Sequence, residues 1–118
     1  MKHQINFEVL KGAKDFFVIA QYQANDAIVC IQSNKSDANK TVDLARKLLK
    51  LVHNNSDVKI WISASLCTVF ATYGDDKTIF GDAYSELESV RRAYNFFFNL
   101  TDLFKSLMED TANVAFGG

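Results

Sequence analysis

Residues 16–54 read FFVIAQYQANDAIVCIQSNKSDANKTVDLARKLLKLVHN. The spacing of their apolar residues is typical of strands up to residue 32 and of a helix after residue 40. Residues 16–23 and 27–32 are short segments rich in aromatic and β-branched residues, which is typical of strands. Ala24-Asn25-Asp26 separates them and favours a turn, because Asn and Asp tolerate a left-handed backbone. After residue 40 the apolar residues recur every three or four positions, which predicts an amphipathic helix.

A further strand is predicted upstream of this stretch. Ile5, Phe7 and Val9 alternate with polar residues, as in a strand with one buried face. The segment KGAKD, residues 11–15, would form the turn into the next strand. Because residues 16–23 are the most apolar of the three segments, we expect them to form the central strand of an antiparallel meander.

The predicted helix begins after a polar segment and ends near His53. Ser36 or Asp37 is the expected N-cap, since short oxygen-bearing side chains accept hydrogen bonds from the first free backbone N–H groups. The apolar residues form one stripe that neighbouring leucines widen: Val42, Ala45, Leu49 and Val52, with Leu44, Leu48 and Leu51 beside them. The width of this stripe predicts that the helix packs on a sheet.

Residues 58–80 allow two descriptions. The stretch 58–73 is too long for one typical strand, so we expect one strand over 58–63, a turn near Ala64-Ser65 and another strand over 66–73. The alternative places the turn at residues 74–77 and a returning strand at 78–80. The strand pattern does not choose between them.

A long helix is predicted to close the domain, from Tyr84 to about Met108. Ser85-Glu86-Leu87-Glu88 has the spacing of a capping box at its start. Its apolar residues fall on two stripes and one further position. The first stripe contains Leu87, Val90, Tyr94, Phe97, Phe104 and Met108, the second contains Phe96, Leu100, Leu103 and Leu107, and Phe98 lies on neither.

One sheet face can cover only one of these stripes, so we expect another protein or a second copy of this chain to cover the rest. Trp61 alternates with its two isoleucine neighbours along a predicted strand; it would lie either on an outward interface or in the core. The predicted interface residues are Phe96, Phe98, Leu100, Leu103 and Trp61.

The composition is that of an average globular domain. The chain has 118 residues, 48% of them apolar, and we expect one domain over 1–118 with residues 110–118 as a flexible tail. With 13 basic and 14 acidic residues, it lacks the basic excess typical of nucleic-acid-binding proteins. It also shows no apolar run of the roughly twenty residues that a membrane span requires, and no signal peptide.

The cysteines indicate a reducing compartment. Cys30 and Cys67 both lie in apolar stretches, and a secreted disulfide scaffold of this size usually has more cysteines. We therefore expect two reduced thiols in a cytoplasmic protein, with a single disulfide between them as the alternative.

Motifs for chemistry are sparse. Tyr73-Gly74-Asp75-Asp76 resembles the metal-binding hairpin of polymerase palm domains, in which paired carboxylates hold Mg²⁺. We interpret it as a hairpin turn, because Gly and Asp favour turns on steric grounds. There is no zinc-ligand spacing, phosphate-binding loop or nucleophile elbow. The sequence thus predicts no catalytic residue, no metal and no cofactor, and a protein that is not an enzyme.

The predicted fold is α+β, with an antiparallel sheet of order β-β-β-α-β-β-α packed against two helices, the C-terminal one long. Over residues 5–108 this order resembles the fold of type III secretion chaperones and their bacterial relatives, without the usual first helix. Members of that family are small, mildly acidic dimers that bind partner chains and catalyse nothing. The resemblance implies a homodimeric protein-binding module with a chaperone-like or regulatory role. The alternative is a small-molecule-binding regulatory domain with a pocket between the sheet and the C-terminal helix.

Overall fold

A computed structural model describes residues 5–22, 24–54, 58–73 and 78–100. The elements in chain order are β1 (Ile5–Lys11), β2 (Phe16–Tyr22), β3 (Asn25–Gln32), α1 (Lys35–Asn54), β4 (Val58–Ser63), β5 (Thr68–Tyr73) and β6 (Thr78–Ala83). A second helix, here called the C-terminal helix, covers residues 87–100 of the described chain. The predicted α+β class is confirmed, while the expected continuation of this helix to Met108 and the expected tail at 110–118 lie outside the described residues.

The strands form two antiparallel sheets. The first sheet has the order β1-β2-β3, so the apolar segment β2 is central, as predicted. The second sheet has the order β4-β5-β6. The two descriptions of residues 58–80 each account for part of the second sheet, because β5 pairs with β4 on one side and with β6 on the other. Residues 74–77 lie outside the described residues. In the turn between β4 and β5 the Cys67 N–H donates to the Ala64 carbonyl at 3.3 Å, and Cys67 has a positive φ of 46°.

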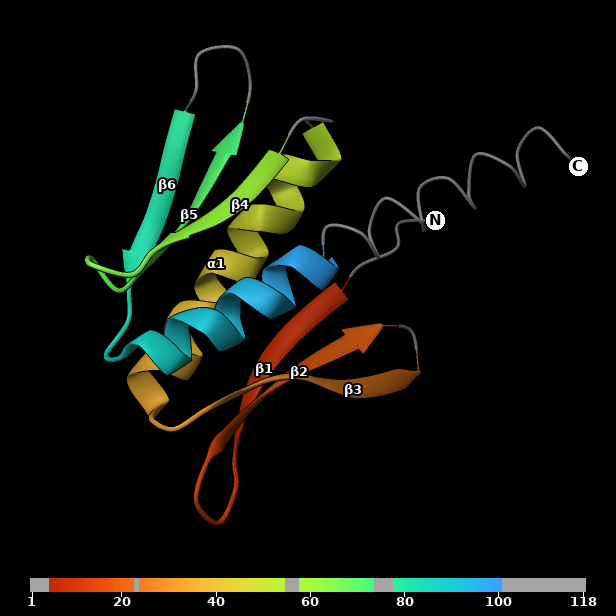
Figure 1. Cartoon of the computed structure of the whole chain (residues 1–118). Helices are drawn as coiled ribbons and strands as arrows, with labels where there is room; N and C mark the ends of the chain where they lie inside the picture. Colours follow the sequence, from red (N-terminus) through yellow and green to blue (C-terminus); the bar gives the residue numbers. More distant parts are fainter. Residues whose placement is uncertain (1–4, 23, 55–57, 74–77, 101–118) are drawn as a thin grey trace, which may run out of the picture.

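Both helices lie between the two sheets (Figure 1). The buried apolar residues of both sheets and both helices form a single core. Each helix therefore needs two apolar sides, one for each sheet. A single five-stranded sheet, which the sequence pattern favours, would leave one side of each helix uncovered.

The contacts of particular side chains show this two-sided packing. On α1, Val42 faces β1 and β2 of the first sheet, whereas Leu44 and Leu48 face β4 and β5 of the second. On the C-terminal helix, the Phe96 ring meets the Phe7 ring of β1 edge to face, with centroids 5.8 Å apart. The neighbouring Phe97 lies against the second sheet. The two stripes of this helix are thus covered within the chain as far as Leu100.

The chain repeats one unit, three strands followed by a helix. The two helices also have the same pattern of buried residues. In each helix a small hydroxyl residue comes first, an apolar residue follows it directly, an alanine comes three residues later, and a large apolar residue three residues after that. These residues are Thr41, Val42, Ala45 and Leu48 in α1 and Ser89, Val90, Ala93 and Phe96 in the C-terminal helix. The hydroxyl and alanine positions are small, which lets elements approach closely at the centre of the molecule.

No described helix is both long and apolar enough to cross a membrane.

Candidate functional site

The face of the first sheet that points away from the helices is largely apolar. Leu10, Phe17 and Ile31 lie opposite one another on β1, β2 and β3 and form one row across the sheet. Ile19 and Ile28 pair in the next row. Leu10, Ile28 and Ile31 are 50%, 57% and 40% exposed. We call these five residues the outer apolar face.

The outer apolar face is separate from the core. Ile19 is only 7% exposed, yet it does not belong to the cluster of core residues that includes Val18. Strand β2 is apolar on both sides, because Val18 and Ala20 face the core while Phe17 and Ile19 face outward. Strands that are apolar on both faces are typical of sheets that are covered on both faces. The sequence signal for this surface is the continuous apolar run FFVI, residues 16–19, which also indicates that β2 is central.

The corresponding face of the second sheet is different. Trp61 is 40% exposed there and stacks on Phe70 of β5, with ring centroids 4.3 Å apart and ring planes 21° apart. Gly81 of β6 lies opposite Phe70 and leaves room for its ring. The remaining side chains of this face on β4 and β5 are polar: Lys59, Ser63, Thr68 and Thr72. Trp61 is therefore outward, the first of its two expected positions, within a polar surface.

The other predicted interface residues lie in different places. Phe96 and Leu100 are 5% and 4% exposed and belong to the core, because the second sheet supplies the cover that one sheet could not. Phe98 is 50% exposed, and its ring lies 6.2 Å from that of Tyr94 on the same helix. Leu103 is outside the described residues. The described members of the predicted set therefore do not form one surface.

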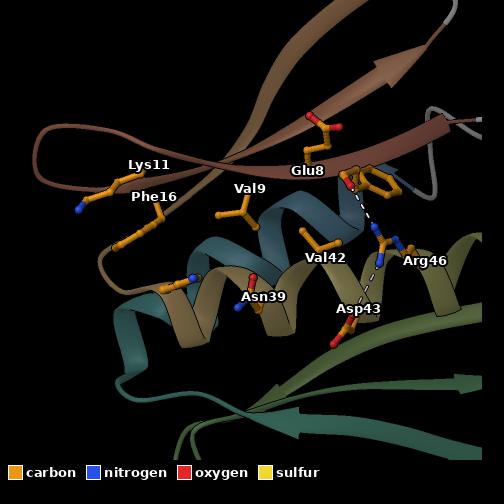
Figure 2. Close-up of a pocket in the computed structure, with 10 residues that line it drawn as sticks. Glu8, Val9, Lys11, Phe16, Asn39, Val42, Asp43 and Arg46 are labelled. Atoms are coloured by element: carbon orange, nitrogen blue, oxygen red, sulfur yellow. Dashed lines mark hydrogen bonds and ion pairs between the residues drawn. The ribbon is translucent and has the colours of Figure 1, made fainter.

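A groove of about 820 Å³ lies between the hairpin β1–β2 and α1. Figure 2 shows Val9 and Phe16 of the hairpin and Val42 of α1 pointing into it. Lys11 and Lys35 also line this groove. It lies beside α1, whereas the pocket expected from the sequence lies beside the C-terminal helix. A second, much smaller space of about 10 Å³ lies between α1 and the second sheet, with Phe97 of the C-terminal helix in its lining.

A polar cluster centred on the buried Asp37 joins the starts of the two helices. Asn34 is the N-cap of α1, since its side-chain oxygen accepts from the Asp37 N–H at 2.8 Å. The expected caps, Ser36 and Asp37, lie inside the helix instead. The Asp37 carboxylate accepts hydrogen bonds from the Ser85 backbone N–H at 3.1 Å and from the Ser85 hydroxyl. Ser85 thus pairs with α1 and not with Glu88, the partner that the predicted capping box implied.

The polar cluster lowers the pKa of the Asp37 carboxyl. Burial acts to raise the pKa of this carboxyl, but hydrogen bonds from Ser85 and Asn34 outweigh burial, so the pKa lies below its usual value. Deeper in the same region, the buried Gln32 amide donates to the Ser89 carbonyl at 3.1 Å. These contacts tie β3 and α1 to the C-terminal helix, which is a structural role.

The two cysteines lie within the described residues and have nucleophilic potential. Burial raises the pKa of the Cys30 thiol to about 11, so this thiol is protonated at neutral pH and is a poor nucleophile. Both cysteines are free, Cys30 buried and Cys67 half-buried. Among the described residues there is no cluster of three His, Cys, Asp or Glu side chains that could hold a metal ion. Asp75 and Asp76 lie outside the described residues.

Comparisons of the chain with protein-family models, with curated proteins and with solved structures gave no match.

Proposed function

We propose that this protein is a non-enzymatic protein-binding module that forms a homodimer through the outer apolar face. One observation carries the proposal: three large apolar residues of this face, Leu10, Ile28 and Ile31, are each at least 40% exposed on a sheet whose other face is already covered by helices. Exposed apolar residues gathered on one surface mark contact sites, because their burial against a partner is favourable. A chaperone-like or regulatory role in the cytoplasm is part of this proposal.

The occupant that we propose for this surface is the same sheet of a second copy. Two sheets pack face to face at about 10 Å with their strands nearly aligned, and a two-fold axis places the same residues on both sides. The row Leu10, Phe17 and Ile31 would then pack against the partner's outer apolar face without a buried charge. The two apolar rows of this face contain one charged residue, Glu8, which lies on the edge strand β1. This low charge favours self-association.

The size of the surface sets the expected strength of the dimer. Three strands of seven or eight residues present a face of about 23 Å by 14 Å, or roughly 300 Å². Stable complexes bury about 800 Å² per partner. We therefore expect a dimer that dissociates on dilution, as weak complexes do.

Light scattering over a hundredfold range of protein concentration tests this proposal. The mass of the natural chain should rise from 13.3 kDa toward twice that value. Ile31→Lys, on the edge strand β3, should keep the fold and weaken the dimer at least tenfold, because a charge would be buried at the interface. Thr72→Lys adds the same charge to the outer face of the second sheet and should leave the dimer unchanged. A mass of 13.3 kDa at every concentration, or a dimer that persists in Ile31→Lys, overturns the proposal.

A further inference from the structure

The groove between the hairpin β1–β2 and α1 has an apolar floor. Val9 and Phe16 come from the hairpin and are only partly covered by the core, and Val42 comes from α1. Figure 2 shows these three side chains pointing toward one another from the two elements. A volume of about 820 Å³ lies within the range of about 300–1,000 Å³ that is usual for small-ligand sites.

Positive charge gathers at one end of this groove. Lys11 pairs with Phe16 in the strand register, so both share the side of the sheet that faces α1. Lys35 is the first residue of α1 and lines the same groove. Neither lysine has an ion-pair partner within the described part of the chain.

The acidic side chains near the groove do not cancel this charge. Asp43 lies 3.9 Å from the Arg46 guanidinium and is paired with it. Arg46 also donates to the Phe7 carbonyl at 3.2 Å and lies at the opposite end of the groove from Lys11 (Figure 2). Glu8 points away from α1, from the far side of β1 (Figure 2). The groove thus combines an apolar centre with two unpaired cations at one end.

We propose that this groove binds a small organic anion with an apolar body, such as a medium-chain fatty acid. The alkyl chain would lie on Val9, Phe16 and Val42, where it leaves water, and the carboxylate would lie between Lys11 and Lys35. Both lysines are exposed, so each contributes modestly, and the affinity should fall as salt increases. The site is on the opposite face of the first sheet from the outer apolar face, so this proposal is independent of the homodimer.

Titration with octanoate, followed by NMR of the backbone amides, tests the proposal. We expect saturable shifts concentrated at Val9, Asn39 and Val42. Three related probes separate the two halves of the ligand: acetate has the charge alone, 1-octanol has the chain alone, and octylammonium has the chain with the opposite charge. Acetate and octylammonium should each bind at least tenfold more weakly than octanoate, and 1-octanol should bind more weakly as well.

Three variants complete the test. Lys11→Gln with Lys35→Gln removes both cations from exposed positions and should weaken octanoate binding at least fivefold. Asn39→Phe fills the groove from an exposed position on α1 and should abolish binding. Lys59→Gln removes one cation from the second sheet and should change nothing. Unaltered thermal unfolding without ligand confirms that each variant is folded. Absence of saturable shifts with octanoate, equal binding of octylammonium, or full binding by the double lysine variant overturns the proposal.

Discussion

The Asp37 carboxylate, in the first turn of α1, accepts a hydrogen bond from the Ser85 backbone N–H at 3.1 Å. A side chain of α1 thus caps the segment that leads into the C-terminal helix. Asn34 takes part in the same cluster, since its amide donates to Asp37 at 3.1 Å and to the Ser85 hydroxyl at 3.0 Å. The two units of the repeat therefore meet at a buried charge as well as in the apolar core. Because this charge is held by several donors, its removal has a measurable cost.

Asp37→Asn should lower the free energy of unfolding by about 1–2 kcal/mol at pH 7, the usual cost of a lost capping hydrogen bond to a charged group. The pKa of Asp37 in the folded protein is below its usual value, so the stabilisation is present above about pH 4. It is lost as the pH falls through the pKa of the folded state, where the carboxylate becomes protonated. Urea unfolding at pH values from 7 down to 2.5 should therefore show the difference between natural chain and variant shrinking below about pH 4.

Asp43→Asn is the matched control for this measurement. The Asp43 side chain is 69% exposed and lies 3.9 Å from that of Arg46. An exposed ion pair contributes about 0–1 kcal/mol, so the control should change stability little at any pH. Equal stability of Asp37→Asn and the natural chain at pH 7 would show that the cluster does not stabilise the fold.

Phe96 and Phe98 should respond very differently to truncation. Phe96 is 5% exposed and packs on Phe7, so Phe96→Ala should cost about 3–5 kcal/mol through lost burial and a cavity. Phe98 is 50% exposed, and Phe98→Ala should cost less than about 1 kcal/mol. Urea unfolding of both variants measures the two costs. Similar small losses would mean that Phe96 is a surface residue, as the one-sheet interpretation required.

Alanine should be tolerated better at Gly12 than at Gly81. A Cβ on Gly81 would lie 2.5 Å from the Val69 carbonyl oxygen, a backbone atom of the neighbouring strand that cannot move alone. A Cβ on Gly12 would lie 2.5 Å from the tip of the Phe17 ring, which can rotate, and 3.0 Å from the Asp15 carbonyl. We expect Gly81→Ala to cost about 1–3 kcal/mol and Gly12→Ala to cost less, as measured by thermal unfolding. A larger loss for Gly12→Ala would contradict this ranking.

The two cysteines should differ in reactivity. With a pKa of about 11, the Cys30 thiol is ionised in on the order of one molecule in a thousand at pH 8, and it is buried as well. Cys67 is half-buried in the turn between β4 and β5. A thiol reagent at pH 8 should therefore label Cys67 first and Cys30 only after denaturant is added. Simultaneous labelling in the native state would show that the region around Cys30 opens readily; Cys67→Ser is the control that isolates Cys30.

The strands and α1 could be predicted from the sequence because their signals are local. Alternation at Ile5, Phe7 and Val9 reports one buried face, and the three-to-four-residue spacing around Val42 reports a helix. The central position of β2 followed from its composition. These properties depend on neighbours along the chain, so no knowledge of the tertiary structure was needed.

The division into two sheets could not be predicted in the same way. A pattern of apolar residues shows that Phe96 and Phe97 are buried, but it does not show which surface buries each of them. With one sheet assumed, a helix with two apolar stripes indicated an unseen partner. The Asp37–Ser85 contact joins residues far apart in the sequence, and Ser and Asp near helix starts look alike whether they cap their own helix or another. The outer apolar face could not be predicted for a related reason. The run FFVI contributes side chains to both faces of β2, and since all four are apolar, the sequence does not show that one of these faces is exposed.

The sequential pairing of strands has a consequence for synthesis on the ribosome. Each described strand pairs only with strands that precede or follow it directly, so residues 5–32 can complete the first sheet before the rest of the chain is made. Leu44 and Leu48, however, pack against the second sheet, which is complete only when residue 83 has emerged. At about 5–20 residues per second, the nascent chain leaves this side of α1 uncovered for a few seconds. The half-made protein is therefore at its most prone to aggregation in that interval, although each half carries its own sheet.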